Sequence, residues 1–194
     1  MIKKFKQKNG RFPTSEDIER LCLDISTRAE IAPSELLRNY FYHARPASGV
    51  ITNPFDQSRT DLSSTLVHSQ HESLLDRLEL APNFSVRLGE TVANGWRLGS
   101  SAMTSLRRTP RSIQAADFVP DITQKGVDLR IGMDIARLSL REMVSVIVVV
   151  TGDSDLIPAF KFARREGVRV YLECLGHGVR RDLKAHADMV FEDK

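Results

Sequence analysis

The sequence predicts one α/β domain, spanning residues 1–194, with three layers and a mostly parallel central sheet. Two observations indicate this class. The C-terminal half alternates helix, strand, helix, strand and helix, an order that calls for right-handed crossovers between parallel strands. Within it, Val144–Thr151 is a continuous run rich in β-branched residues, typical of a central parallel strand buried on both faces. With 194 residues, of which 41% are hydrophobic, the chain can bury a real core.

Helix and strand patterns alternate less regularly in the first half. Residues 1–14 are basic and are expected to be irregular. Ser15 has the character of an N-cap, and Ile18, Leu21 and Ile25 supply the apolar face of a helix over 15–29. The other expected elements are a strand over 36–42, a loop over 43–65, a helix over 65–80 and a strand over 84–90.

Residues 91–123 show no clear periodicity and are expected to form an insert over one face or an irregular region. From residue 126 to the C-terminal end, the patterns of helices and strands are clear again. The expected elements are a helix over 126–140, the strand over 144–151, a helix over 155–166 ended by Gly167, a strand over 168–173, a helix over 179–187 and a short strand over 189–191. His177, between two glycines, is expected to be a loop histidine of no special role.

The charge of the chain permits contact with nucleic acid without requiring it. The net charge is +3 and the sequence pI is about 9.0. The basic residues gather in groups: Arg107, Arg108 and Arg111; Lys161, Arg164, Arg165 and Arg169; and Arg180 with Arg181. A solvated surface explains any one group, whereas several groups near one acidic site favour a polyanionic substrate.

The cysteines and the apolar runs bear on where the protein works. Cys22 and Cys174 lie far apart and in no metal-ligand spacing, so both are expected to be reduced and the protein cytoplasmic. Val144–Val150 is too short to cross a bilayer, and no secretory signal is expected at the N-terminus. The sequence also allows a homo-oligomer.

Acidic residues mark two helix starts in the C-terminal half. Asp153 and Asp155 flank Ser154 directly after the apolar strand, and Asp128 follows Lys125 and Gly126 at the start of the next helix upstream. Helix capping explains a single acid at each place. Two acids around a serine exceed what capping needs, and chemistry in open α/β sheets gathers at the carboxyl ends of strands. Asp134 is a weaker candidate because six residues separate it from Asp128.

Three carboxylates at one end of a sheet would repel one another without a cation. Oxygen ligands with neither cysteine nor clustered histidine select Mg²⁺ or Mn²⁺ over zinc. Such a metal activates water and neutralises charge on a phosphodiester, so the sequence predicts phosphodiester hydrolysis. Lys125, Ser154, Arg164 and Arg165 are the expected contacts to the substrate phosphates.

Three segments resemble one known family. Residues 124–134 read QKGVDLRIGMD, residues 148–159 read VVVTGDSDLIPA, and residues 163–168 read ARREGV. Together they resemble the NYN (LabA-like) domains of the PIN-like nuclease superfamily, strongly over 124–188 and more loosely over 15–123. The resemblance implies a Rossmann-like sheet, a divalent metal and action on RNA. It assigns the family's acids to Asp128, Asp153 and Asp155.

The N-terminal part departs from this family. Its members begin with an apolar strand that ends in an aspartate, whereas residues 1–14 contain no acid and no such strand. A misplaced start, a truncated chain and a degenerate member are the three explanations, and the last makes a non-catalytic RNA-binding or regulatory module the main alternative to a ribonuclease.

Two other classes of enzyme share parts of the pattern. A GDSL-type serine hydrolase would use Ser154 as nucleophile and His186 as base. A Toprim-like DNA enzyme would need Glu90 at the end of a strand.

Overall fold

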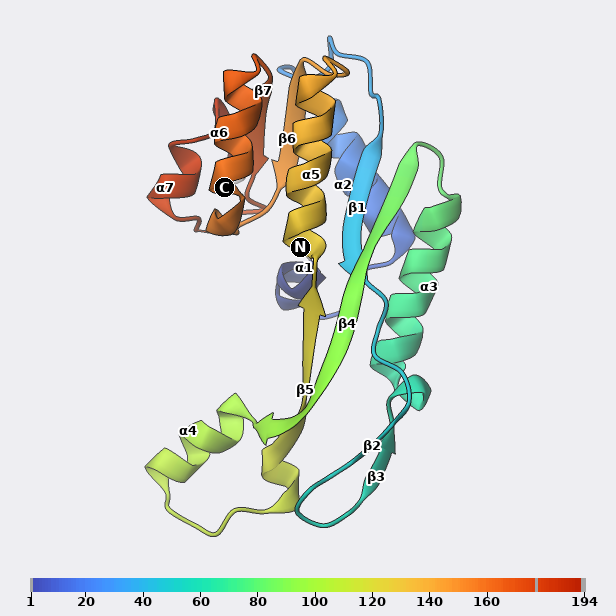
Figure 1. Ribbon diagram of the computed structural model, residues 1–194, viewed down its shortest axis with the longest axis vertical. Coiled ribbons are helices and arrows are strands. Elements are labelled where there is room, and N and C mark those ends of the chain that lie inside the picture. Colours follow the sequence, from blue (N-terminus) through green and yellow to red (C-terminus); the bar gives the residue numbers. More distant parts are fainter. Residues whose placement is uncertain (1, 177, 193–194) are drawn as a thin grey trace.

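The computed structural model describes residues 2–176 and 178–192, so the expected loop histidine at 177 lies outside the described residues. Its strands form two separate three-stranded sheets and a two-stranded hairpin (Figure 1). The prediction of an α/β protein is confirmed. The single central sheet that the sequence suggested is divided into two parts.

The first sheet has the strand order β1-β4-β5. Strand β1 (Asn39–Ala44) runs parallel to the first half of β4 (Phe84–Leu98), and the second half of β4 pairs antiparallel with β5 (Phe118–Lys125). The second sheet is wholly parallel, with β7 (Arg169–Glu173) between β6 (Val146–Val150) and β8 (Met189–Phe191). The expected mostly parallel sheet is therefore only partly present, since the second sheet is wholly parallel and the first is mixed.

The run over 144–151 is a strand, as predicted, but its expected central position is wrong. Among the described residues β6 pairs with β7 alone, and all five of its side chains are only half buried. Four of the five residues of β7 are buried instead, because β7 has a neighbour on each side. A continuous β-branched run predicts an apolar environment, and it cannot say which strand of the sheet is the central one.

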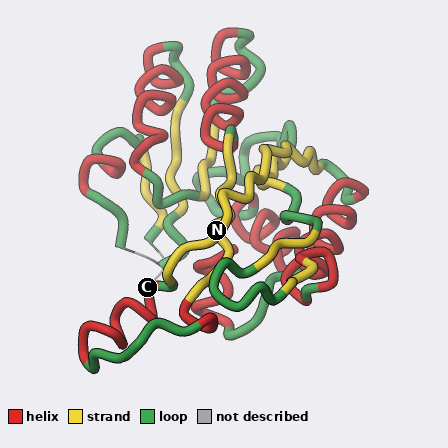
Figure 2. The backbone as a smooth tube through the Cα atoms, turned by 60° about the horizontal axis from the view of Figure 1, so that its bottom comes forward, coloured by secondary structure: helices red, strands yellow, loops and turns green. Residues whose placement is uncertain are grey.

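Two helices cover both sheets, one from each face. Helix α2 (Ser15–Ser26) contributes Ile18 to the cluster on β1 and β4, and Ile25 to the cluster on the second sheet. On the opposite face, α5 (Val127–Leu140) contacts β1, β4 and helix α6 (Ile157–Arg165). Figure 2 shows α5 and α6 standing side by side. The two sheets are thus held together by helices, while β1 and β6 do not pair.

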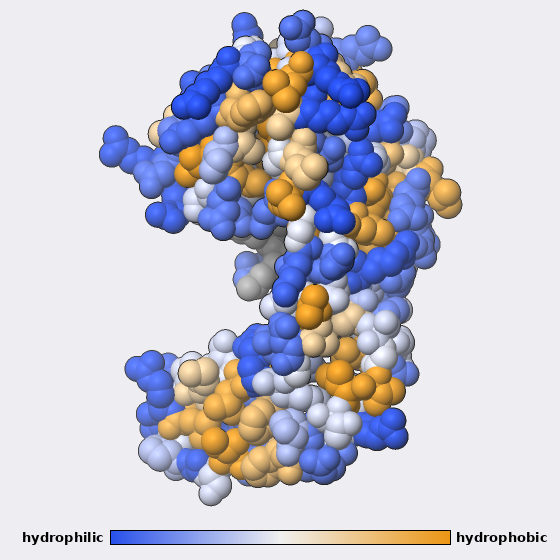
Figure 3. Space-filling model, in the orientation of Figure 1, coloured by the Kyte–Doolittle hydropathy of each residue, from blue (hydrophilic) through white to orange (hydrophobic). Residues whose placement is uncertain are grey.

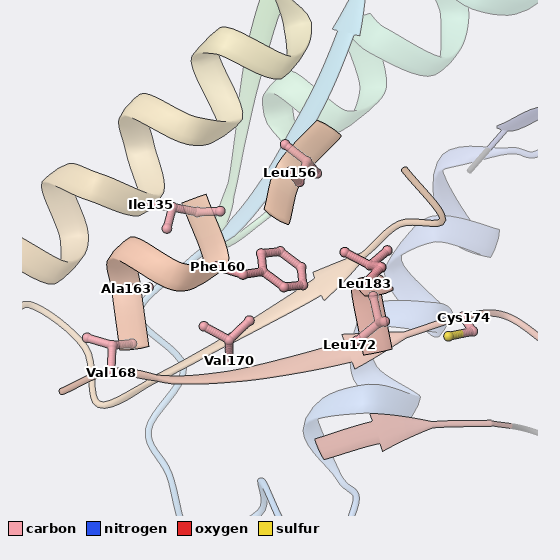
Figure 4. Packing of buried hydrophobic residues seen from close by; sticks show 9 residues of the cluster. All are labelled: Ile135, Leu156, Phe160, Ala163, Val168, Val170, Leu172, Cys174 and Leu183. Carbon is pink, nitrogen blue, oxygen red and sulfur yellow. The ribbon is translucent and has the colours of Figure 1, made fainter. Parts of the chain in front are cut away.

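The largest core cluster lies under α6. Phe160 is fully buried and points from α6 toward Val170 of β7 and Leu183 of α7 (Arg181–Lys184) (Figure 4). Cys174 belongs to this cluster, whereas Cys22 packs beside the cluster on β1 and β4. Burial raises the pKa of the Cys22 thiol to about 11, which keeps it protonated.

The segment 91–123, expected to be an insert or an irregular region, is ordered. Its strands β4 and β5 form a long ribbon that leaves the main body and carries helix α4 (Ser100–Arg108) and the 3₁₀ turn η2 (Ala115–Asp117) at its far end. The expected loop over 43–65 contributes the hairpin of β2 (Val50–Thr52) and β3 (Arg59–Asp61), followed by the turn η1 (Leu62–Ser64). We call α4, η2 and this hairpin the distal lobe.

Three polar contacts hold the distal lobe together. Asn53 is buried and donates from Nδ2 to the Ala115 carbonyl at 3.1 Å. Arg111 forms two hydrogen bonds with Asp117, of 2.6 and 2.7 Å. Apolar contacts contribute as well, since the rings of Phe55 and Phe118 lie 6.1 Å apart and Leu62 of η1 is buried.

Smaller differences concern the N-terminal third. Residues 1–14 were expected to be irregular, yet Ile2–Asn9 forms helix α1. The N-cap of α2 is Thr14 rather than Ser15, since Thr14 and Asp17 form a capping box. Strand β1 begins three residues later than expected, and α3 (Leu66–Leu80) agrees closely with its prediction.

Candidate active site at the carboxyl ends of the strands

A left-handed glycine positions Asp128. Strand β5 ends at Lys125, and Gly126 has φ 75°, a conformation that costs a residue with a Cβ about 1–2 kcal/mol. This sharp turn lets α5 start at once, so that Asp128 lies in its first turn, where the helix dipole favours an anion. Lys125 is exposed and pairs across the ribbon with Glu90.

Gly89 allows β4 to pass close to this turn. A Cβ at position 89 would lie 2.6 Å from the Lys125 carbonyl oxygen and 2.8 Å from Val127 Cγ2. Both distances are below van der Waals contact, and the nearer atom belongs to the backbone, so the turn itself would have to move.

Gly89→Ala is therefore expected to destabilise the protein and to displace Asp128. Overpacking of this kind costs about 1–3 kcal/mol. Urea unfolding followed by circular dichroism measures the loss, with Gly95→Ala as a contrast, because a Cβ at 95 meets no atom within 4 Å although its φ of 95° adds strain. Equal stability of Gly89→Ala and wild type would show that the close approach does not constrain the turn.

The second acidic segment follows β6 directly. Asp153 Oδ1 accepts a hydrogen bond from the Asp155 backbone N–H at 3.0 Å and so caps the 3₁₀ turn η3 (Ser154–Leu156). The Asp153 N–H donates to Thr151 Oγ1 at 3.0 Å. One oxygen of Asp153 thus has the capping role that the sequence allowed, while both Asp153 and Asp155 remain exposed to solvent.

Electrostatics link the two segments. The pKa of Asp128 is raised, first by partial burial and then by the negative charges of Asp153 and Asp155. None of these three carboxylates forms an ion pair with a described residue. In the described part of the chain, however, no three His, Cys, Asp or Glu side chains are grouped closely enough to hold a metal ion. Asp153 and Asp155 therefore act electrostatically on Asp128, but the three side chains do not form a ready-made metal site.

Arg180 is the basic side chain that the structure brings to this segment. Its Nη1 donates to Ser154 Oγ at 3.3 Å, and its Nη2 lies 3.9 Å from Asp182. The sequence showed Arg180 as part of a basic group, but no spacing rule linked it to Ser154, because 26 residues separate them.

Arg164 and Arg165 are not brought to the acids. They end α6, nine residues long, and the helix begins beside the acids, so they lie about 10–12 Å further along its axis. Arg164 Nε binds Asp188 Oδ1 at 2.9 Å, and both arginines line a shallow depression with Lys161, Arg169 and His186. Both arginines lie in the last turn of α6, where a positive charge interacts favourably with the helix dipole. This structural role explains their presence without a contact to the acids.

Asp134 also lies apart from the other acids and has partners of its own. It accepts hydrogen bonds from Tyr42 Oη at 2.9 Å and from Arg87 Nε at 3.2 Å. Burial and the charge of Asp134 raise the pKa of Tyr42, so the phenol stays protonated and remains a donor. These contacts fasten α5 to β1 and β4.

The geometry bears on the two rival enzymes. Ser154 Oγ contacts Arg180, whereas His186 lines the depression with Arg164 and Arg169, so the pair that a serine hydrolase needs is not formed. Glu90 lies within β4, which continues to Leu98, and not at the end of a strand. The structure therefore supports neither the serine hydrolase nor the Toprim-like enzyme.

A histidine pair lies near the carboxyl end of β1. His43 and His71 meet edge to face with ring centroids 5.0 Å apart. Burial, and next the charge of His71, lower the pKa of His43 to about 4, and burial also lowers the pKa of His71.

His43 should make the protein lose stability in mild acid. The unfolded chain binds a proton at His43 below pH of about 6.5, and the folded chain does so only near pH 4. The stabilisation is present above pH 6.5 and is lost as the pH falls toward 4, by on the order of 2–3 kcal/mol. Denaturant unfolding between pH 4 and 8 should show a weaker pH dependence for His43→Gln than for wild type, and equal slopes would contradict this assignment.

The fold and site together define an α/β protein with exposed carboxylates at the starts of α5 and η3, directly after strands of a mixed sheet and of a parallel sheet. The family model of the NYN domain matches residues 90–193, which is more than half of the 194 residues. The chain therefore belongs to the NYN domain family, and its fold is the PIN-like, nuclease-type fold. Neither the curated proteins nor the solved structures include a match to this chain. Within the described residues, no helix is both long and apolar enough to cross a membrane.

Proposed function

We propose that this chain is a Mg²⁺- or Mn²⁺-dependent ribonuclease that hydrolyses RNA phosphodiester bonds at Asp128, Asp153 and Asp155. The observation that carries the proposal is the placement of three carboxylates at the starts of α5 and η3. Partial burial raises the pKa of Asp128, and the charges of Asp153 and Asp155 raise it further, which supports their nearness. No described cation forms an ion pair with them, so the site has an uncompensated negative charge that a divalent metal would neutralise.

The donor chemistry fits Mg²⁺ or Mn²⁺, since all three side chains offer hard oxygens. The acids stand too far apart to form a cage, and Mg²⁺ typically uses one or two carboxylates together with waters and substrate phosphate. When bound, the metal would supply an activated water and neutralise charge on the scissile phosphate.

The side chains of the site would bind the metal, orient the water and bind the RNA. Asp153 and Asp155 would hold the metal at the end of β6, with Asp153 oriented by its capping hydrogen bond. Asp128 would complete the site from α5 and orient the attacking water. Arg180 and Lys125 would bind the RNA backbone as charge-assisted donors.

The shape of the surface suits an extended substrate. Figure 3 shows a hollow between the main body and the distal lobe. The carboxyl ends of the strands face this hollow from above, and α4, which has Arg107 and Arg108 in its last turn, borders it from below (Figure 1). A single RNA strand in this hollow would have basic side chains on both sides of it.

Incubation of the purified chain with a labelled single-stranded RNA tests the proposal. Cleavage with Mg²⁺ or Mn²⁺ and its loss in EDTA support a ribonuclease. A second function, RNA binding without cleavage, is favoured by the lack of a preassembled three-residue metal group. Binding that is unaffected by EDTA, with no cleavage under either condition, would establish that alternative and overturn the first.

Arg180→Ala is expected to weaken RNA binding about 3- to 10-fold, the effect of losing one charge-assisted phosphate contact. Arg165→Ala is the matched control, because it removes the same charge at the far end of α6. Fluorescence anisotropy at two salt concentrations measures both. A larger loss for Arg165→Ala than for Arg180→Ala would place the RNA at the opposite end of the sheet.

A further inference from the structure

Helix α4 and the chain on either side of it form a segment without acidic side chains. Residues 91–116 contain four arginines, and all 25 acidic residues of the protein lie outside this segment. Two of the arginines form ion pairs with Asp117 and Asp121. The other two, Arg107 and Arg108, are exposed in the last turn of α4 and form no ion pair with another described residue. The distal lobe therefore presents positive charge that the protein itself does not neutralise.

A depression along α4 is lined by polar groups alone. Every side chain in its lining has a hydroxyl or a guanidinium group: Ser100, Ser101, Thr104, Ser105, Arg108 and Thr109. Such groups bind the phosphate and sugar oxygens of nucleic acids. None of the nine residues of α4 is buried, so packing of a core does not explain this composition. The chemistry of the depression fits a ligand that is anionic and rich in oxygen acceptors.

The distal lobe holds this surface in place. The Gly99 N–H, at the start of α4, donates to the Asp117 carbonyl at 2.8 Å, and Asp117 is itself buried. Asn53 and the ring of Phe55 tie the hairpin of β2 and β3 to η2 and β5. A surface that is ordered before its ligand arrives loses less conformational entropy on binding.

The ribbon sets the distance between α4 and the acids. Strand β5 begins at Phe118, which pairs with Leu98 beside the distal lobe, and ends at Lys125, directly before the turn that positions Asp128. Its eight residues span about 24 Å at 3.4 Å per residue. A stacked single strand rises about 3.4 Å per nucleotide, so about seven nucleotides cover the length of β5.

We propose that α4 is a second binding surface for single-stranded RNA, and that it favours RNA long enough to contact α4 and the acids at once. Only the place of cleavage depends on the proposed function, because binding to α4 needs neither the metal nor the acids. RNA is favoured over an acidic polypeptide because α4 borders the same hollow as the candidate site (Figures 1 and 3). Arg107 and Arg108 would bind phosphates, and the hydroxyls would bind phosphate or ribose oxygens. A strand held at both surfaces binds more tightly than one held at either, since the second contact forms within the same complex.

The test compares variants of α4 in the full chain. Arg108→Gln removes one positive charge, and Ser101→Ala/Ser105→Ala removes two hydroxyls while placing a better helix former at each position. Arg20→Gln is the matched control, because Arg20 is exposed on α2, which covers the opposite face of the sheets from α5. Fluorescence anisotropy with a labelled RNA of about 20 nucleotides, three times the length of β5 in stacked nucleotides, is recorded in EDTA at several salt concentrations. Unlabelled RNA and polyglutamate of equal charge serve as competitors.

Arg108→Gln should weaken binding of this RNA about 3- to 10-fold and lower the slope of log Kd against log salt by about one. The double serine variant should weaken binding about 2- to 10-fold, and Arg20→Gln should change it less than either. With Mg²⁺, kcat/KM should rise with RNA length up to about seven nucleotides or more, and this rise should be smaller in Arg108→Gln.

Wild-type affinity of both α4 variants in EDTA would overturn the proposal, whether or not the protein cleaves RNA. Polyglutamate that displaces the labelled RNA as well as unlabelled RNA does would assign α4 to an acidic polypeptide, which also overturns it. An equal rise of kcat/KM with length in Arg108→Gln and wild type would show that α4 does not favour long RNA. Weakened binding by both variants in a protein that cleaves no RNA would support α4 as an RNA-binding surface and refute the ribonuclease alone.

Discussion

Asp153→Asn is expected to abolish metal-dependent RNA cleavage while leaving the fold intact. Loss of one charged ligand removes a metal contact and part of the field that acts on Asp128, which together should lower the rate by at least about two orders of magnitude. Asparagine keeps an oxygen that can accept the hydrogen bond from the Asp155 N–H, so η3 retains its cap. Initial rates with a labelled RNA at saturating Mg²⁺ measure the effect.

The control is Asp121→Asn, which removes one carboxylate on β5 that forms a 3.4 Å ion pair with Arg97. It changes the net charge equally and should leave the cleavage rate within about twofold, since an exposed ion pair contributes little. Circular dichroism and thermal unfolding of Asp153→Asn should match those of wild type. Cleavage that still requires Mg²⁺ and proceeds at the wild-type rate in Asp153→Asn would refute the assignment of this site.

The C-terminal half of the fold could be predicted because its signals are local. Gly126, Gly167 and the β-branched run each mark an element boundary within a few residues, and α5, β6 and α6 lie where the sequence placed them. The ribbon of β4 and β5 could not be predicted in this way, since Glu90 pairs with Lys125 and Leu98 with Phe118 across a long connection. Pairing of that kind depends on tertiary contacts that no short window of sequence contains.

The acidic residues of the candidate site could be identified from the sequence, whereas the basic residue that lies beside them could not. The sequence grouped Asp128 with Asp153 and Asp155 because the carboxyl ends of parallel strands share one edge of a sheet. Their charges do act on Asp128, but β5 is antiparallel and lies in a different sheet from β6, so that rule is not the reason. Arg165 was assigned to the site from its nearness in sequence, but a nine-residue helix carries it away. Arg180 reaches Ser154 only because α7 folds back beside η3. Residues close in sequence can thus lie at opposite ends of a helix, as Asp155 and Arg165 do.

The buried ion pair between Arg28 and Glu173 should be the most sensitive point for stability. Glu173 is fully buried at the carboxyl end of β7, and its Oε2 lies 2.7 Å from Arg28 Nη2, while its Oε1 accepts from the Leu175 N–H at 2.6 Å. The Arg28 guanidinium also lies over the ring of Phe191, 4.4 Å from its centroid. The pair therefore ties the segment after α2 to the centre of the second sheet.

Arg28→Met is expected to lower the free energy of unfolding by about 3–5 kcal/mol, because it leaves a buried carboxylate without its cation. The double variant Arg28→Met/Glu173→Gln should recover a large part of this loss, since glutamine carries no charge and can still accept from Leu175. Chemical denaturation of both variants and of Glu173→Gln completes the cycle. If the double variant is no more stable than Arg28→Met, the loss comes from the packing of Arg28 on Phe191, and the charge of Glu173 is not its cause.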